Sequence, residues 1–304
     1  MFKKNKVLID EIYHLAELDG GKFSVCSTKE AYAFCKKIAV EHYENFPVGS
    51  VLLPRKLRKH FYSIYAFSRI SDDIGDELIK FSTVEHAKNT LNKYKTSLEA
   101  IYSNKNIYTS NPIFLALRNT VHEFNIPISP FIKLISAFER DISFEKFQNF
   151  DDLLEYCDNS ANPIGELILR LFGEFNENNL KYSNKICSAL QLINFWQDIS
   201  VDININRVYI PQEVLNTTDN KSQIVKLLLD YTENMMAEGA LLLDNIRNYR
   251  FKLELSAIIS GGNLLIDKIK KEGENIFFNR PKITKQDALK LFYKSLMLMI
   301  RPKI

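Results

Sequence analysis

The sequence predicts one all-α domain over residues 1–304, built from roughly eight to ten helices of ordinary length. Apolar residues recur at helical spacing along almost the whole chain. We find no alternating run bounded by turn dipeptides that would indicate a strand, and no Pro/Gly/Ser-rich linker. With 46% hydrophobic residues, the 304-residue chain has ample material for one large core.

Helix starts can be read at several points along the chain. Ser27-Thr28-Lys29-Glu30 predicts a capping box, and Ser129 before Pro130 predicts an N-cap with proline in the first turn. Residues 284–287 predict the start of a last helix. Loops are expected at residues 103–112, 172–179 and 203–220.

Composition and charge exclude several classes of protein. The formal net charge is only +3, and no basic run interleaves with aromatic residues, so no nucleic-acid partner is expected. The 4 cysteines show no CxxC spacing, which favours free thiols in a reducing cytosol. No apolar run reaches the roughly 18 residues that a membrane span needs. We therefore expect a cytoplasmic protein, peripheral at most at the inner face of the membrane.

The first acidic cluster follows an apolar helix. In residues 61–70 the apolar positions form two stripes, which predicts a helix buried on several sides. Asp72 and Asp76 then lie four residues apart, hence one turn apart on one face, while Asp73 is turned away. Arg69, three residues before Asp72, reaches the same face and could grip a diphosphate.

The second acidic cluster repeats this spacing. Asn194, Asp198 and Asp202 are each four residues apart, so their direction drifts by only about 80° around a helix. Like charges at this spacing weaken a helix unless a cation compensates them. Mg²⁺ would do so, and water and substrate phosphate oxygens would complete its coordination. The two clusters together predict a diphosphate-ionising enzyme.

The segment after the second cluster, residues 204–211, carries Arg207 and Tyr209 and is expected to fold over whatever the carboxylates bind. Such lids keep water from reactive intermediates. The alternative is that both clusters are interhelical ion-pair networks, which is less favoured because unpaired buried carboxylates are costly. Trp196 points to the opposite face from Asn194 and Asp198, where core packing is expected.

These motifs resemble the bacterial squalene/phytoene synthase family, which performs head-to-head prenyl condensations. The resemblance covers roughly residues 40–295 and rests on 65–69, 72–76, 194–202 and 206–211. It implies an isoprenoid-synthase-type helical bundle around a central apolar cavity. Residues 42–50, 160–166 and 195–198 are most similar to the hydroxysqualene synthase branch.

The resemblance implies roles for individual residues. The metal ligands, for two or three Mg²⁺ ions, would be Asp72, Asp76, Asn194, Asp198 and Asp202. The catalytic residues would be Arg69, Arg207, Tyr156 and Tyr209. Substrate would be bound by Tyr65, Phe67, Asn45, Ala161, Asn162, Gly165 and Gln197. Among these, the small residues Ala161 and Gly165 would let a long isoprenoid chain pass.

The chain departs from the first-step synthases at two positions. Glu44 stands where a base is expected, and Gln197 stands where an arginine is expected. Both changes remove positive charge, which favours a site that handles one diphosphate. The expected reaction is therefore conversion of presqualene diphosphate to hydroxysqualene, a step of squalene and hopanoid biosynthesis, with no nicotinamide. No dinucleotide fingerprint is present, in line with that expectation.

Two alternatives stay open. A first-step synthase would make presqualene diphosphate, dehydrosqualene or phytoene from two allylic diphosphates, and a non-catalytic isoprenoid-binding or assembly protein would use the same fold. Intact acidic clusters disfavour the second alternative. Besides a prenyl diphosphate, the expected partners are a membrane surface, contacted transiently, and other enzymes of the squalene pathway.

Overall fold

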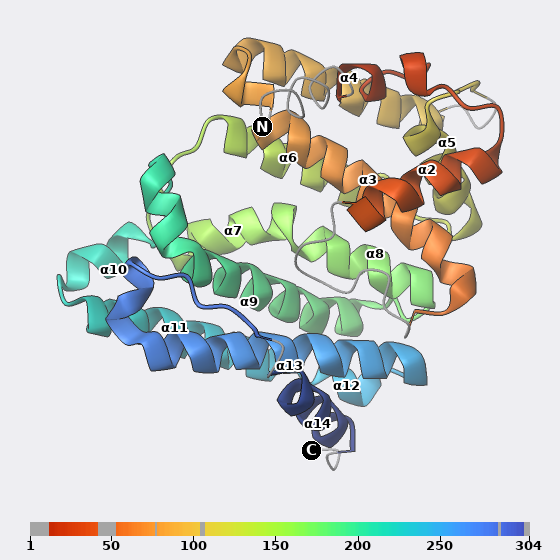
Figure 1. Ribbon diagram of the computed structural model, residues 1–304. Helices are drawn as coiled ribbons and strands as arrows, with labels where there is room; N and C mark the ends of the chain where they lie inside the picture. Colours follow the sequence, from red (N-terminus) through yellow and green to blue (C-terminus); the bar gives the residue numbers. More distant parts are fainter. Residues whose placement is uncertain (1–11, 42–52, 77, 104–106, 285–286, 301–304) are drawn as a thin grey trace. The chain divides into compact units, whose positions relative to one another are not determined.

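Helices make up all the regular structure in residues 12–41, 53–76, 78–103, 107–284 and 287–300, which the computed structural model describes (Figure 1). Within these ranges there are 13 α-helices and no strand, so the all-α prediction is confirmed. The predicted number of helices was too low. None of the helices in the described ranges is long and apolar enough to cross a membrane.

The chain divides into two compact units, Met1–Phe144 and Glu145–Ile304. The prediction of a single domain over residues 1–304 stays a prediction. The first unit contains η1 (Gly21–Phe23), α2 (Thr28–Glu41), α3 (Arg55–Asp76), η2 (Leu78–Lys80), α4 (Val84–Ser103), α5 (Pro112–Glu123) and α6 (Ser129–Ile142).

Helix α3 is the centre of the first unit. It packs against α2, α4, α5 and α6, as expected for a helix with two apolar stripes. Phe67 of α3 is 0% exposed. Its ring contacts those of Tyr94, Phe114 and Phe131, with centroids 4.9, 6.4 and 5.2 Å away. This aromatic cluster joins α3, α4, α5 and α6 into one core.

The second unit is built around the longest helix. Its elements are α7 (Phe150–Ser160), α8 (Asn162–Phe172), α9 (Glu177–Asp202), η3 (Ile203–Ile205), α10 (Gln212–Thr217), α11 (Lys221–Gly239), α12 (Leu242–Asn245), α13 (Tyr249–Glu272), η4 (Gly273–Phe277) and α14 (Asp287–Ile300). Helix α9 packs against α7 and α8 on one side and against α11 and α13 on the other (Figure 1).

Two features fix the packing of α9 against α11. Trp196 is 0% exposed, and its Nε1 donates to Thr232 Oγ1 at 2.9 Å, so the expected core role of Trp196 is confirmed. Gly239, at the end of α11, lies directly on α9. A Cβ at Gly239 would stand 2.9 Å from the backbone nitrogen of Ile186. Only glycine permits so close an approach between backbones.

Capping side chains define several helix starts. The predicted capping box is present, because Glu30 N–H donates to Ser27 Oγ at 3.2 Å and Ser27 N–H donates to Glu30 Oε2 at 3.1 Å. Five further N-caps are asparagines whose side chains accept backbone N–H bonds: Asn111, Asn149, Asn176, Asn220 and Asn248. Ser129 was predicted as an N-cap, but it is the first residue of α6, with Ile128 before it and no side-chain cap.

Candidate active site

The first acidic motif lies at the end of α3. Asp76 is the last residue of α3 and Asp72 lies one turn before it, and the last turn of the helix contains no basic residue. The helix C-terminus carries partial negative charge, which disfavours further negative charge there, and a bound cation would offset that effect. Gly75, between them, is buried against α6, and a Cβ there would stand 3.2 Å from the Phe138 carbonyl oxygen. The glycine therefore sets how closely the acidic turn approaches α6.

Arg69 and Asp73 form a partly buried ion pair behind this motif. Arg69 Nη2 donates to Asp73 Oδ1 at 2.5 Å, and its Nη1 donates to Asp72 Oδ2 at 3.3 Å. Asp73 is only 1% exposed, which agrees with the prediction that it turns away from Asp72. Arg69 thus reaches Asp72 as predicted, while Asp73 fixes the guanidinium in place.

The Asp72 carboxyl is strongly perturbed by its surroundings. The side chain is 37% exposed, yet the protein around it removes much of its bulk water. This burial, followed by repulsion from Asp76, raises the pKa of Asp72 to about 7 despite the opposing effect of Arg69. Near neutral pH the Asp72 carboxyl is therefore divided between its protonated and ionised forms, and a further cation nearby would favour the ionised form.

The second acidic motif lies in the last turns of α9. Asn194 is exposed, whereas Asp198 and Asp202 are half-buried. The last turn of α9 contains no basic residue, as in α3. Both motifs therefore place carboxylates at the negative end of a helix.

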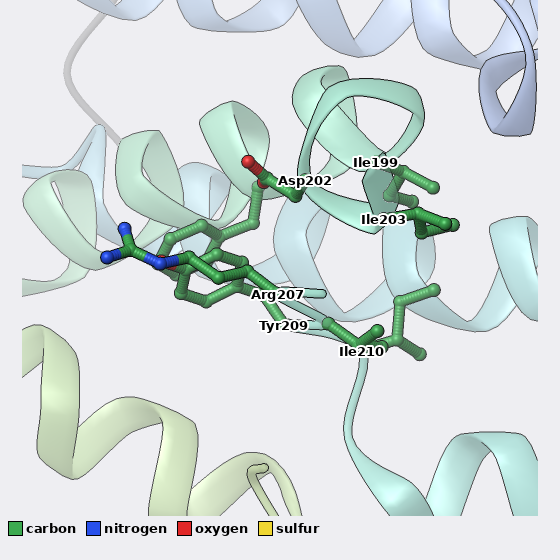
Figure 2. Close-up of a pocket in the computed structure, with 8 residues that line it drawn as sticks. Ile199, Asp202, Ile203, Arg207, Tyr209 and Ile210 are labelled. Atoms are coloured by element: carbon green, nitrogen blue, oxygen red, sulfur yellow. The ribbon is translucent and has the colours of Figure 1, made fainter. Parts of the chain in front are cut away.

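A sharp turn brings Arg207 back to the end of α9. Asn206 has φ 58°, a left-handed conformation that asparagine tolerates better than most residues. The turn allows Arg207 N–H to donate to the Asp202 carbonyl at 2.9 Å. Figure 2 shows the resulting small pocket, in which the polar ends of Asp202 and Arg207 lie to one side and the side chains of Ile199, Ile203 and Ile210 to the other.

The predicted tyrosines meet in an aromatic cluster of the second unit. Tyr209 stacks on Phe195 with ring centroids 3.9 Å apart, and Phe195 lies 6.0 Å from Tyr156. Phe147 contacts both tyrosines, at 5.6 Å from Tyr156 and 5.9 Å from Tyr209. Because Tyr209 and Phe195 also line the Asp202 pocket, aromatic faces and a carboxylate are neighbours here.

One charged residue of this region was missed by the sequence analysis. Arg280, between η4 and α14, grips Asp198 with both of its forked nitrogens: Nε donates to Oδ1, and Nη2 donates to Oδ2 at 3.1 Å. Gln197 donates its amide to the Pro281 carbonyl at 2.6 Å. Position 197 thus carries no positive charge, whereas Arg280 places one beside the neighbouring Asp198.

Several predicted substrate-binding residues have structural partners. Phe67 is enclosed in the core cluster, where its ring packs rather than lining a site. Gly165 allows α8 to pack on α9, since a Cβ there would stand 2.7 Å from Cys187 Sγ. Asn162 is 4% exposed and bonds Asp158 and Ser188.

Phe67, Gly165 and Asn162 therefore take part in helix packing, and their predicted roles in substrate binding stay predictions. Ala161 is half-buried at the junction of α7 and α8, and Tyr65 is half-buried on α3. Asn45 lies outside the described residues.

The residues present fit a hard divalent cation. All five predicted ligands offer oxygen donors, the type that Mg²⁺ prefers. Within the described ranges, no three Asp, Glu, His or Cys side chains gather into a preformed metal cluster. Mg²⁺ is commonly held by one or two carboxylates, with waters and substrate phosphates completing its shell, and each motif supplies that number.

Comparison with solved structures defines the class of the protein. Residues covering 81% of this chain superpose on 95% of a squalene synthase from Alicyclobacillus acidocaldarius, with a TM-score of 0.75 and 32% identity. A dehydrosqualene synthase solved in complex with a ligand gives a TM-score of 0.77 at 20% identity, over 88% of this chain and 96% of the other. The fold is the all-α isoprenoid-synthase type.

The chain belongs to the squalene/phytoene synthase family, whose sequence profile matches residues 39–287. It is 27% identical to a hydroxysqualene synthase from Sinorhizobium fredii over 253 residues, 76% of this chain and 81% of the relative. It is also 30% identical to a phytoene synthase from Mycobacterium bovis over 205 residues, 67% of this chain and 63% of the relative. The predicted resemblance is confirmed, and the family is one of head-to-head prenyl synthases.

Proposed function

We propose that this protein converts presqualene diphosphate to hydroxysqualene with release of diphosphate, a step of squalene and hopanoid biosynthesis. The observation that carries the proposal is the pair of carboxylate motifs at the ends of α3 and α9, each with an arginine beside it. Mg²⁺ would be held by Asp72, Asp76, Asn194, Asp198 and Asp202, and would supply Lewis-acid stabilisation of the leaving diphosphate.

Arginines complete the binding of the leaving group. Arg69 is anchored by Asp73, and Arg207 is positioned by its backbone bond to Asp202, so each presents a guanidinium at the edge of a motif. As the ester C–O bond breaks, its electron pair leaves with the diphosphate. Donors that are already fixed strengthen their hydrogen bonds to that growing charge without rearrangement.

The aromatic cluster of Tyr156, Phe195 and Tyr209 would stabilise the carbocation left behind. Ring faces attract positive charge, and more strongly when water is excluded. Addition of a water oxygen to the cation and loss of one proton then give the alcohol. No hydride enters this sequence, so we expect no requirement for a nicotinamide.

Similarity to hydroxysqualene synthases supports the choice of this branch of the family. Hydroxysqualene synthases from Zymomonas mobilis and Rhodopseudomonas palustris are 33% and 29% identical to this chain, over 57% and 71% of its length. We extend the proposal to transient contact with a membrane and to association with other squalene-pathway enzymes, because the substrate tail and the product are apolar.

A first-step synthase that condenses two allylic diphosphates is the second candidate, and one observation favours it. Gln197 was expected to leave the second motif without a positive charge, but Arg280 supplies one beside Asp198. The missing charge at position 197 therefore no longer separates the two branches, so the products must be compared directly. A non-catalytic binding protein would have no reason to keep both motifs intact.

The deciding experiment is a product assay with purified protein and Mg²⁺ but no nicotinamide. Presqualene diphosphate and farnesyl diphosphate are supplied separately, and lipid products are identified by mass spectrometry. We expect hydroxysqualene from presqualene diphosphate and unchanged farnesyl diphosphate. Condensation of farnesyl diphosphate would establish the second candidate instead. If both substrates are recovered intact while an authentic hydroxysqualene synthase turns over, the enzymatic proposal is wrong.

A further inference from the structure

The carboxylate of Asp198 is already paired with a positively charged side chain in this structure. Arg280 binds both of its carboxylate oxygens in a forked geometry, with side chains that are 36% and 29% exposed for Arg280 and Asp198. A forked arginine–carboxylate pair uses one lone pair on each oxygen and places a positive charge directly against the carboxylate. A metal ion that approaches the same carboxylate is repelled by that charge unless the arginine moves away.

The segment that carries Arg280 is fixed at a second point. Pro281 is buried, and its carbonyl accepts a hydrogen bond from Gln197 at 2.6 Å. Two adjacent residues of α9, Gln197 and Asp198, thus hold two adjacent residues of the segment. Since Gln197 fixes the backbone, the Arg280 side chain can leave Asp198 without moving the whole segment.

We propose that Arg280 is an internal competitor of the metal. It occupies Asp198 while the site is empty, and it yields the carboxylate only when Mg²⁺ arrives together with a diphosphate. Mg²⁺ alone must overcome both the loss of the ion pair and repulsion by the guanidinium. An accompanying anion gives the released guanidinium a new partner. This inference rests on the proposed metal ligation and makes Arg280 a positioning residue that couples the two ligands.

The competition can be measured without turnover. We expect Arg280→Gln, which removes the charge but keeps a hydrogen-bonding group, to bind Mg²⁺ alone about tenfold more tightly than the natural chain, corresponding to about 1.4 kcal/mol. Isothermal calorimetry with MgCl₂, or paramagnetic resonance with Mn²⁺, gives this affinity. Arg280→Lys keeps the charge and should stay near the natural value.

A matched control separates local competition from a general change of charge. Lys185, also on α9, forms an ion pair with Glu238 at 3.2 Å on α11. Lys185→Gln removes one positive charge from the helix that carries Asp198, but at a site away from that carboxylate. It should leave Mg²⁺ affinity within about twofold, because exposed charges are screened. Thermal unfolding of each variant shows whether it retains the fold.

Inorganic pyrophosphate tests the coupling itself. It should raise the Mg²⁺ affinity of the natural chain more than that of Arg280→Gln, because only the natural chain has a guanidinium to satisfy. Equal Mg²⁺ affinity in a folded Arg280→Gln and the natural chain would overturn the proposal, as would undetectable metal binding in every variant. Failure of the product assay with these binding differences present would reject the proposed reaction alone.

Discussion

The carboxylates of Asp72 and Asp76 stand where a helix least favours them. The end of α3 already carries partial negative charge from its unsatisfied carbonyls, and Asp73 and Asp141 add more around Asp72. This arrangement costs stability in the free chain. Residues that weaken the fold in this way are expected where binding requires them.

Replacing Asp72 by Asn should therefore separate activity from stability. We expect turnover to fall by at least about a hundredfold, because changes even to groups that support a metal ligand cost 10–100-fold. The metal-free variant should unfold at the same temperature or slightly higher, since one of several like charges is gone. Turnover assays and thermal unfolding measure the two effects.

Asp219→Asn is the matched control, because it removes an exposed carboxylate from the loop before α11. It should change neither turnover nor stability appreciably. Normal turnover in Asp72→Asn would remove the first motif from the site.

Residues of the candidate site were predictable where spacing along one helix or a motif of neighbouring residues reveals them. Asp72 and Asp76, and likewise Asp198 and Asp202, stand one turn apart, and Arg69 lies within reach of Asp72. Arg280 is 82 residues from Asp198 and follows no period, so only the fold brings them together. The packing role of Phe67 was also hidden, because aromatic residues line sites and fill cores alike.

At the scale of whole elements, close contact between helices depends on particular glycines. Gly239→Ala should destabilise the protein by about 1–3 kcal/mol, because the new methyl group would press on the Ile186 backbone of α9, which cannot rotate away. Urea unfolding gives the change in the free energy of unfolding.

Gly261 in α13 provides the contrasting substitution. The nearest atom to a Cβ there is Leu291 Cδ1, at 3.9 Å. Gly261→Ala should be neutral or stabilise by up to about 1 kcal/mol, since alanine is the better helix former. If both substitutions had the same effect, the close approach of α9 and α11 would not be the cause.

The start of α14 should respond to acid. Lys268 of α13 donates to Asp287 at 2.9 Å, and the Thr284 N–H and hydroxyl each donate at 2.7 Å. These bonds, that from Lys268 first, hold the pKa of Asp287 well below its usual range. In an unfolded chain an aspartate has a pKa of about 3.9, whereas the folded Asp287 carboxyl stays ionised below that pH. Its stabilising effect is therefore complete above about pH 3.9 and fades as the pH falls further.

Hydrogen exchange of α14 amides, compared between Asp287→Asn and the natural chain at each pH, should therefore show faster exchange in the variant near pH 6. The difference should narrow below about pH 4. Asp267→Asn breaks another α13–α14 ion pair, that with Lys294 at 2.8 Å, in which the Asp267 side chain is 53% exposed. Its effect should be smaller. A constant difference for Asp287→Asn across this range would contradict the assignment.

Element boundaries were predictable where side chains form the cap, as Ser27 and Glu30 do. The break between α7 and α8 adds a helix that periodicity alone does not reveal. Pro163 lacks the N–H that a continuous helix would need, so α7 ends and α8 begins within a few residues. Short helices such as α10 and α12 have too few turns to produce a recognisable period.

At the scale of the whole molecule, the sequence has one tryptophan, Trp196, which lies in the second unit. Its fluorescence therefore reports the unfolding of that unit, whereas far-UV circular dichroism reports helices of both. If residues 1–304 form a single cooperative domain, as the sequence predicts, both probes should give the same urea midpoint. Separate midpoints would show that the two units unfold independently.

Fold class and family were predictable because they depend on patterns repeated along the chain, such as helical periodicity and two similar motifs. The contact of Arg280 with Asp198 depends on how distant segments meet, and only the structure provides it.

The ion pairs Arg69–Asp73 and Arg280–Asp198 also bear on whether the chain can fold before it binds Mg²⁺. Because these arginines neutralise carboxylates within the chain, the protein should be able to fold where Mg²⁺ is scarce and to bind Mg²⁺ afterwards. Chelators should then remove the activity without unfolding the protein. Activity should return on addition of Mg²⁺ at the rate of ion binding rather than of refolding. Synthesis and activation would be separate, independently controlled steps.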